Sequence, residues 1–197
     1  IRVHVDERAE LDPAQPVVFV ANHQVAIDIP VMMRTLPLPF AFVAKSTVRA
    51  LPVLGFFAQR TGSVFVDRSN PRRSLADLGR AAELLRNGRS ILFFAEGTRS
   101  FAPVVGPLHS GAFRLAITTQ APIVPVTLRN TYRLADERAF ASHPGIAQVV
   151  VGSPIQTQGL TRRHIPMLME TVATIIRGEL AAEHDHWAAS QHPQDTF

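Results

Sequence analysis

Short apolar runs alternate along the chain with longer segments of mixed polarity. The runs are rich in Val, Ile and Phe and show no apolar–polar alternation, as expected of strands covered on both faces. They lie at Val17–Ala21, Phe40–Ala44, Val64–Val66, Ile91–Ala95, Ile123–Leu128 and Gln148–Val151. Segments with helical spacing lie between and after them, at Ile29–Thr35, Thr47–Gln59, Arg73–Asn87, Gly111–Thr119 and His164–Trp187. This order predicts an α/β fold with a mixed, mostly parallel central sheet flanked by helices.

The chain shows no internal repeat and no low-complexity linker. Its 197 residues suit one domain, which we expect over residues 1–189, followed by a flexible polar tail over residues 190–197. No apolar run approaches the roughly 18 residues that a membrane-spanning helix needs. The chain begins at Ile1 rather than Met, so the question of a membrane segment upstream of it stays open.

Composition excludes several classes of protein. The chain has no cysteine, which excludes a disulfide scaffold, a thiolate zinc site and a cysteine nucleophile. The net charge of +4 is too small to indicate nucleic-acid binding. Lys45 is the only lysine, so the basic residues are almost all arginine, which suits anionic headgroups but also follows from codon bias. Glu183 and His184–His186 predict no metal site, because neighbouring side chains on a helix point apart.

Polar residues gather where three of the predicted strands end. They are the segments Asn22–Asp28, Asp67-Arg68 and Glu96–Ser100. Ligands of open α/β sheets bind at the carboxyl ends of strands, so we expect these segments to share one crevice.

His23 and Asp28 form a candidate acid–base pair. On a straight helix they would point about 140° apart, so the pair meets only if His23 lies in the turn before the helix. Pro30 favours a helix start here, which puts Asp28 near the N-cap. Asp28 then orients one imidazole nitrogen and leaves the other as a base for a substrate hydroxyl. The alternative is a buried histidine that merely satisfies a nearby carboxylate.

The segment Glu96–Ser100 has the composition of a phosphate site. Gly97 permits close approach of the backbone to a ligand, while Thr98 and Arg99 supply hydrogen-bond donors. Glu96 is expected to anchor Arg99 or to bond a ligand hydroxyl. The alternative is a strand that ends in an ordinary polar turn.

These motifs together resemble those of the glycerolipid acyltransferases, which include the 1-acyl-sn-glycerol-3-phosphate acyltransferases. The pattern is Asn-His-x4-Asp at residues 22–28, followed by Phe-x-Glu-Gly-Thr-Arg-Ser at residues 94–100. Two further blocks agree, one from Lys45 to Arg68 and one at Ala121–Val126. The resemblance covers roughly Val17 to Leu128.

The resemblance implies an O-acyltransferase. The acyl group would pass from acyl-CoA or acyl carrier protein to the free hydroxyl of a lysophospholipid, by default 1-acyl-sn-glycerol-3-phosphate, to give phosphatidic acid. No cofactor besides the donor substrate is implied. His23 would be the base and Asp28 its orienting acid, and backbone N–H groups near the helix start would hold the oxyanion, together with Lys45. The residues implied to bind substrate are Lys45, Arg68, Glu96, Gly97, Thr98 and Arg99. The enzyme would work at the cytoplasmic face of the cell membrane, peripherally or through an anchor absent from this chain.

Departures from the family pattern leave alternatives open. His109 stands where many relatives have lysine, so another acceptor, such as a lyso-ornithine lipid, is the second choice. A lipid hydrolase or thioesterase and a silent lipid-binding module are the candidates from other classes. The apolar segment Thr47–Arg60 is either a core helix bent at Pro52 or a surface that contacts lipid.

Overall fold

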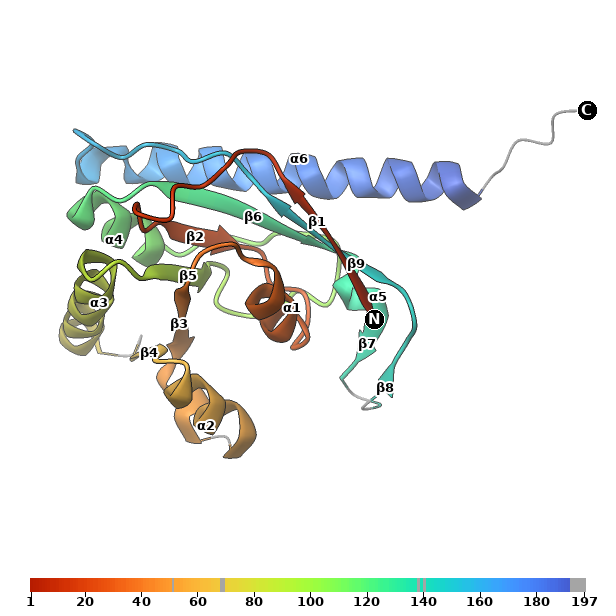
Figure 1. Ribbon diagram of the computed structural model, residues 1–197, viewed down its shortest axis with the longest axis horizontal. Helices are drawn as coiled ribbons and strands as arrows, with labels where there is room; N and C mark the ends of the chain where they lie inside the picture. Colours follow the sequence, from red (N-terminus) through yellow and green to blue (C-terminus); the bar gives the residue numbers. More distant parts are fainter. Residues whose placement is uncertain (51, 68–69, 138, 140, 192–197) are drawn as a thin grey trace, which may run out of the picture.

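A central β-sheet organises the molecule, as Figure 1 shows. The computed structural model describes residues 1–50, 52–67, 70–137, 139 and 141–191. The main sheet has seven strands in the order β1-β9-β6-β2-β5-β3-β4. Its strands are β1 (Arg2–Glu7), β2 (Val18–Ala21), β3 (Phe40–Lys45), β4 (Val64–Val66), β5 (Ser90–Phe94), β6 (Ile123–Arg129) and β9 (Ile146–Val151).

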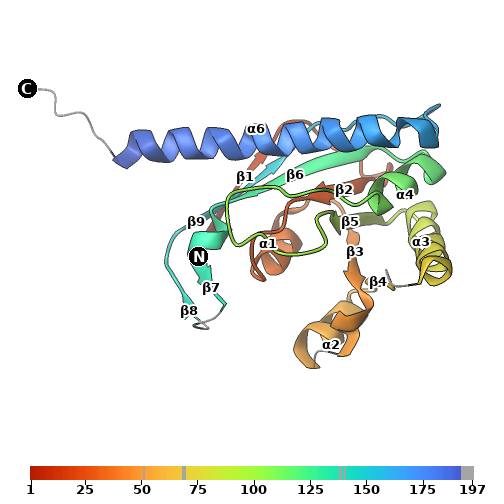
Figure 2. The same cartoon turned by 180° about the vertical axis from the view of Figure 1, so that it is seen from behind.

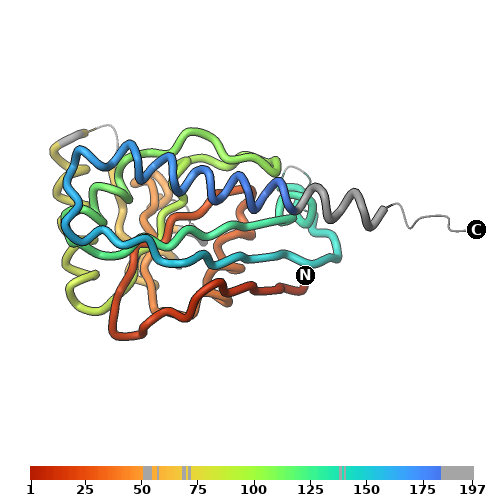
Figure 3. The backbone as a smooth tube through the Cα atoms, turned by 90° about the horizontal axis from the view of Figure 1, so that it is seen from above, coloured from red at the N-terminus to blue at the C-terminus, as the bar shows by residue number. Residues whose placement is uncertain are grey.

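The sheet is mixed but mostly parallel, which confirms the predicted fold class. Strands β6, β2, β5, β3 and β4 run parallel to one another. Strand β9 is antiparallel to β6 and is paired in parallel with β1. Figure 3 shows β1 and β9 side by side along one edge. The carboxyl ends of the parallel strands therefore share one edge of the sheet, where the polar segments were expected.

Helices cover both faces of the sheet, and the central strands are buried on both sides. The helical elements are α1 (Asp28–Thr35), η1 (Ser46–Ala50), α2 (Pro52–Arg60), α3 (Pro71–Arg86), α4 (Gly111–Thr119), α5 (Thr131–Leu134), η2 (Arg162–His164) and α6 (Ile165–Gln191). On β2, Val18 and Val20 pack with α3, α4 and α6, whereas Phe19 and Ala21 pack with α1. The period-2 alternation of a strand makes this division, so every position of β2 is apolar.

The ends of α3 follow the sequence signals for a helix start and stop. The side-chain oxygen of Asn70 accepts hydrogen bonds from the backbone N–H groups of Arg72 and Arg73 at 3.1 and 3.2 Å. Gly88 follows the C-cap with a φ of +81°, a conformation that glycine adopts without strain. Arg72 and Arg73 are exposed, so the start of this helix is solvated.

Two predicted helix boundaries were wrong. Residues 47–59 do not form one helix, because η1 ends at Ala50 and α2 begins at Pro52. Proline has no amide hydrogen for a continuing helix but suits the first turn of a new one. The last helix ends at Gln191 rather than near Trp187, and residues 192–197 of the expected tail lie outside the described residues.

Four short or exposed elements were missed. Strand β1 is an edge strand with a largely exposed face, so it lacks the apolar run of a central strand. Helix α5 has only four residues, and β7 (Ala135–Asp136) and β8 (Ala141–Ser142) pair in a separate two-stranded sheet. Elements this short have no periodicity to detect.

Candidate active site

His23 and Asp28 meet in the turn between β2 and α1, in the way the sequence predicted. His23 Nδ1 lies 2.8 Å from Asp28 Oδ2. Asp28 is the first residue of α1 and is fully buried, so its carboxylate lies at the positive end of the helix dipole. Among the described residues, His23 Nε2 has no hydrogen-bond partner, and the histidine lines a cavity. The geometry leaves Nε2 available as a base.

Asp28 holds the histidine turn as well as the imidazole. The same oxygen, Oδ2, accepts hydrogen bonds from the backbone N–H groups of Gln24 at 2.6 Å and Val25 at 3.0 Å. Oδ1 is buried without a hydrogen-bond partner among the described residues. One carboxylate oxygen thus fixes both the backbone and the ring of the proposed base.

Phe94 packs against one face of the His23 imidazole. Its ring stacks on that of His23 with centroids 3.9 Å apart and an interplanar angle of 14°. Phe94 is the last residue of β5 and packs against the core on the α1 side of the sheet, as Leu92 does two residues earlier. The strand period therefore aims Phe94 at the histidine. From the motif alone, this phenylalanine had no predicted role.

The Glu96 carboxylate accepts hydrogen bonds from two backbone N–H groups, and Arg99 pairs with Glu137 instead. The expectation that Glu96 anchors Arg99 was therefore wrong. Glu96 Oε1 accepts the N–H of His23 at 3.0 Å, and its Oε2 accepts that of Gly106 at 2.7 Å. Glu96 is 7% exposed. The buried carboxylate joins the histidine turn to the long connection between β5 and α4, which runs out past α1 and back in Figure 2. Ser100 N–H adds a bond to the His23 carbonyl at 2.8 Å.

Two buried amides anchor the histidine turn to the rest of the sheet. Asn22 bonds both the N–H and the carbonyl of Leu128, at 2.8 and 2.9 Å, and so continues the pairing of β2 with β6. Gln24 Oε1 accepts from the hydroxyl of Thr131 and the N–H of Tyr132, at the start of α5. The residue types alone gave Gln24 no role, because its partners follow more than 100 positions later.

The cavity beside His23 is lined by both apolar and polar residues, and its volume is about 320 Å³. Aliphatic and aromatic side chains come from α1, β3, η1 and α2, namely Ile29, Phe42, Val43, Ala44, Val48 and Ala58. The polar residues of the lining include Lys45, Thr61, Ser63, Thr98 and Arg99, and Gly97 lies beside them. The predicted site residues Lys45 and Gly97–Arg99 thus share one cavity with His23. Gly97 has a φ of +71°, which favours glycine in this turn.

Arg99 pairs with Glu137, a residue outside every sequence motif. Glu137 Oε2 accepts from Arg99 Nη1, and its Oε1 accepts from the backbone N–H of Ala26. The backbone N–H groups of Gln24, Val25 and Ala26, in the turn before α1, are therefore bonded to carboxylates of the protein.

Two residues singled out by the sequence remain, Arg68 and His109. Arg68 lies outside the described residues. His109 is exposed and does not line the cavity that holds His23, although its N–H bonds the carbonyl of Ala95. His109 is therefore not placed to contact a headgroup in this cavity, as the predicted change in headgroup recognition would require.

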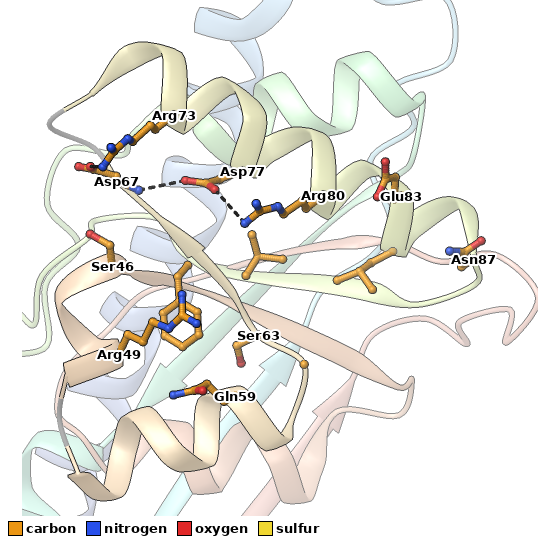
Figure 4. A pocket seen from close by; sticks show the side chains of 14 residues that line it. Ser46, Arg49, Gln59, Ser63, Asp67, Arg73, Asp77, Arg80, Glu83 and Asn87 are labelled. Atoms are coloured by element: carbon orange, nitrogen blue, oxygen red, sulfur yellow. Dashed lines mark hydrogen bonds and ion pairs between the residues drawn. The ribbon is translucent and has the colours of Figure 1, made fainter.

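A second, open groove of about 800 Å³ runs beside the edge strand β4 (Figure 4). Its charged side chains are partly paired within the protein, since Arg73 lies 3.8 Å from Asp67 and Arg80 lies 3.5 Å from Asp77. Ser63 lines both this groove and the cavity of His23.

Over the described ranges, no cluster of three His, Asp or Glu side chains is placed to hold a metal. The side chains of residues 183–190 are not part of that description. Within the same ranges, no helix combines the length and the hydropathy that a membrane crossing requires.

Comparisons with known proteins agree with the motifs. The family model "Acyltransferase" matches residues 1–129. The chain is 32% identical to an uncharacterized acyltransferase of Schizosaccharomyces pombe over 94% of its own length and 67% of that protein. It is 34% identical to the 1-acyl-sn-glycerol-3-phosphate acyltransferase alpha of Mus musculus, over 87% of the chain and 61% of that protein. The chain thus spans about two thirds or less of these relatives.

A solved structure is also similar. It is the crystal structure of the 1-acyl-sn-glycerophosphate (LPA) acyltransferase, PlsC, from Thermotoga maritima. The TM-score is 0.75 and the sequence identity 26%, and the match covers 92% of this chain and 71% of that one.

Proposed function

The chain belongs to the Acyltransferase family, and from this premise we propose that it transfers a fatty acyl group from an acyl thioester to the free hydroxyl of a lysophospholipid. The observation that carries the proposal is the pairing of His23 with the buried Asp28 beside a cavity lined by apolar side chains and by the cations Lys45 and Arg99. The acceptor favoured by the names of the relatives is 1-acyl-sn-glycerol-3-phosphate.

In the proposed reaction, His23 Nε2 takes the proton of the acceptor hydroxyl. The alkoxide oxygen forms a bond to the thioester carbonyl carbon, and the carbonyl electrons move onto its oxygen. When the carbonyl re-forms, the carbon–sulfur bond breaks, and the thiolate takes the proton from the imidazolium. Asp28 stabilises that imidazolium through its 2.8 Å contact with Nδ1. No acyl-enzyme is needed, because the base activates the acceptor directly.

The two kinds of residue in the cavity lining would bind different parts of the substrates. Phe42 and Val48 suit an acyl chain, whereas Thr98 and Arg99 suit the phosphate of the acceptor. Lys45 on the same cavity is the proposed partner of the oxyanion, since the amides of the histidine turn are already bonded. Arg68 stays a proposed second phosphate ligand on the strength of its motif alone.

The donor is proposed to be acyl-CoA or an acyl carrier protein, and the enzyme is proposed to act at the cytoplasmic face of a membrane because both the acceptor and the product are lipids. No bound cofactor is required by the proposed steps. A second acceptor, a zwitterionic lysolipid, finds some support in the carboxylate of Glu137 beside Arg99, since it would suit a cationic headgroup.

The test is incubation of the protein with labelled acyl-CoA or acyl carrier protein and a panel of lysolipids, with the products read by mass. We expect the acyl group to appear on 1-acyl-sn-glycerol-3-phosphate. His23→Ala should lower kcat at least about 10²-fold. His4→Ala, which removes an exposed histidine on β1, is the matched control. Thioester loss without a lysolipid would instead indicate a hydrolase, and binding without turnover would indicate a lipid-binding module.

A further inference from the structure

The Glu137 carboxylate bonds two donors that belong to residues lining the His23 cavity. Glu137 follows β7, and its two oxygens accept from the Ala26 N–H and from Arg99. Ala26 and Arg99 both line the cavity. The Glu137 side chain is 21% exposed and that of Arg99 is 40% exposed. Glu137 itself lines a neighbouring groove, with Phe101 and Tyr132, so a negatively charged group of the protein already holds donors of the cavity residues.

The two donors are of the kind that bind a phosphate. A guanidinium offers paired N–H groups to phosphate oxygens, and a backbone N–H in the turn before a helix points at an anion. The Ala26 N–H has one hydrogen to donate, so Glu137 and a phosphate cannot both accept it. A phosphate bound beside the carboxylate would also be repelled by it.

We propose that Glu137 is a specificity-determining residue that competes with the phosphate of the acceptor for Arg99 and Ala26. The inference rests on the proposed function, because it takes the polar residues Thr98 and Arg99 as the headgroup subsite. A phosphomonoester headgroup must displace the carboxylate in order to bind. A neutral headgroup gains nothing from this displacement. Glu137 thus weakens phosphate binding. It thereby reduces the margin by which the site prefers anionic lysolipids over neutral ones.

Glu137→Gln tests the proposal, with binding measured by isothermal titration calorimetry in the absence of any acyl donor. The probes are short-chain 1-acyl-sn-glycerol-3-phosphate, inorganic phosphate and the matching monoacylglycerol. We expect Kd of the phosphate lysolipid to fall about 10-fold, as expected when a partly exposed charged competitor is removed, with Kd of the monoacylglycerol unchanged. If inorganic phosphate gains as much, the subsite takes free phosphate, and if it does not, the subsite requires the lipid. Both outcomes support the competition.

Glu170→Gln is the control. Glu170 pairs with Arg177 at 2.9 Å on the exposed face of α6, away from the cavity lining. A hydrogen bond from Arg177 lowers the pKa of the Glu170 carboxyl, so the substitution removes a negative charge at neutral pH. We expect Kd of this variant to equal that of wild type for all three probes.

An unchanged Kd for the phosphate lysolipid in Glu137→Gln overturns the proposal. If Glu137→Gln fails to fold, Glu137→Asp takes its place. Its side chain is one methylene shorter and cannot hold both donors, but it keeps the negative charge, so a smaller gain in the same direction is expected.

Acyl transfer measured separately on the same preparations distinguishes this inference from the proposed function. If Kd falls in Glu137→Gln but wild type acylates no lysolipid, the competition stands and the proposed function fails. If wild type acylates the phosphate lysolipid but Kd does not move in the variant, only the inference fails.

Discussion

Replacing Asp28 by asparagine removes the charge that the proposed base depends on while keeping the shape of the side chain. In the native protein, Oδ2 accepts from His23 Nδ1 and from the N–H groups of Gln24 and Val25, at 2.8, 2.6 and 3.0 Å. The amide oxygen of asparagine can keep these three contacts. It cannot stabilise the imidazolium that forms when His23 takes the proton.

The expected loss in kcat is about 10²- to 10⁴-fold, which corresponds to about 3 to 5 kcal/mol in the barrier. The stability cost has a separate origin. The new NH₂ group would occupy the place of Oδ1, which is buried and has no partner among the described residues. Leaving a buried donor unpaired costs about 1–3 kcal/mol, so the free energy of unfolding should fall by that amount.

Steady-state kinetics with acyl-CoA and 1-acyl-sn-glycerol-3-phosphate, run well below the unfolding temperature, give kcat, and urea unfolding gives stability. Asp77→Asn is the matched control. Asp77 also accepts a backbone N–H, that of Asp67, and forms an ion pair, with Arg80, but it lies on α3, away from His23. It should lose stability without losing kcat. The double variant His23→Ala with Asp28→Asn should be no slower than His23→Ala, since the two residues act as one unit. A kcat of Asp28→Asn within 10-fold of wild type would refute the role of the pair.

Three further outcomes are expected. Arg99→Ala should raise KM for the phosphate acceptor with little change in kcat, measured by steady-state kinetics. A lower kcat at constant KM would instead indicate that Arg99 stabilises the oxyanion. Glu96→Gln should lower kcat and reduce the free energy of unfolding by about 1–3 kcal/mol, because its NH₂ group must face the N–H of His23 or Gly106. Gly55→Ala should lower the unfolding temperature, because its Cβ would clash with the carbonyl oxygen of Arg49; an unchanged melting curve would contradict that packing.

Much of the fold follows from local pattern. The central strands are apolar at every position because both of their faces are buried, and this holds for β2 whatever it pairs with. Helix starts and stops follow from residues such as Asn70 and Gly88, whose effects reach only a few positions. The geometry of His23 and Asp28 was predictable for the same reason, since they are five residues apart and a helix start lies between them.

The amino-acid sequence by itself thus determined which segments are buried and which short motifs carry chemistry, because burial and helix capping depend on near neighbours. Only the tertiary structure decided which donors the carboxylates of Glu96 and Glu137 bond. Glu96 holds His23 across 73 positions, and Glu137 reaches Ala26 across 111. Such pairings depend on the order of the strands and on the paths of the loops that follow them. A residue type reveals that it can accept a hydrogen bond, but the fold selects the donor that it meets.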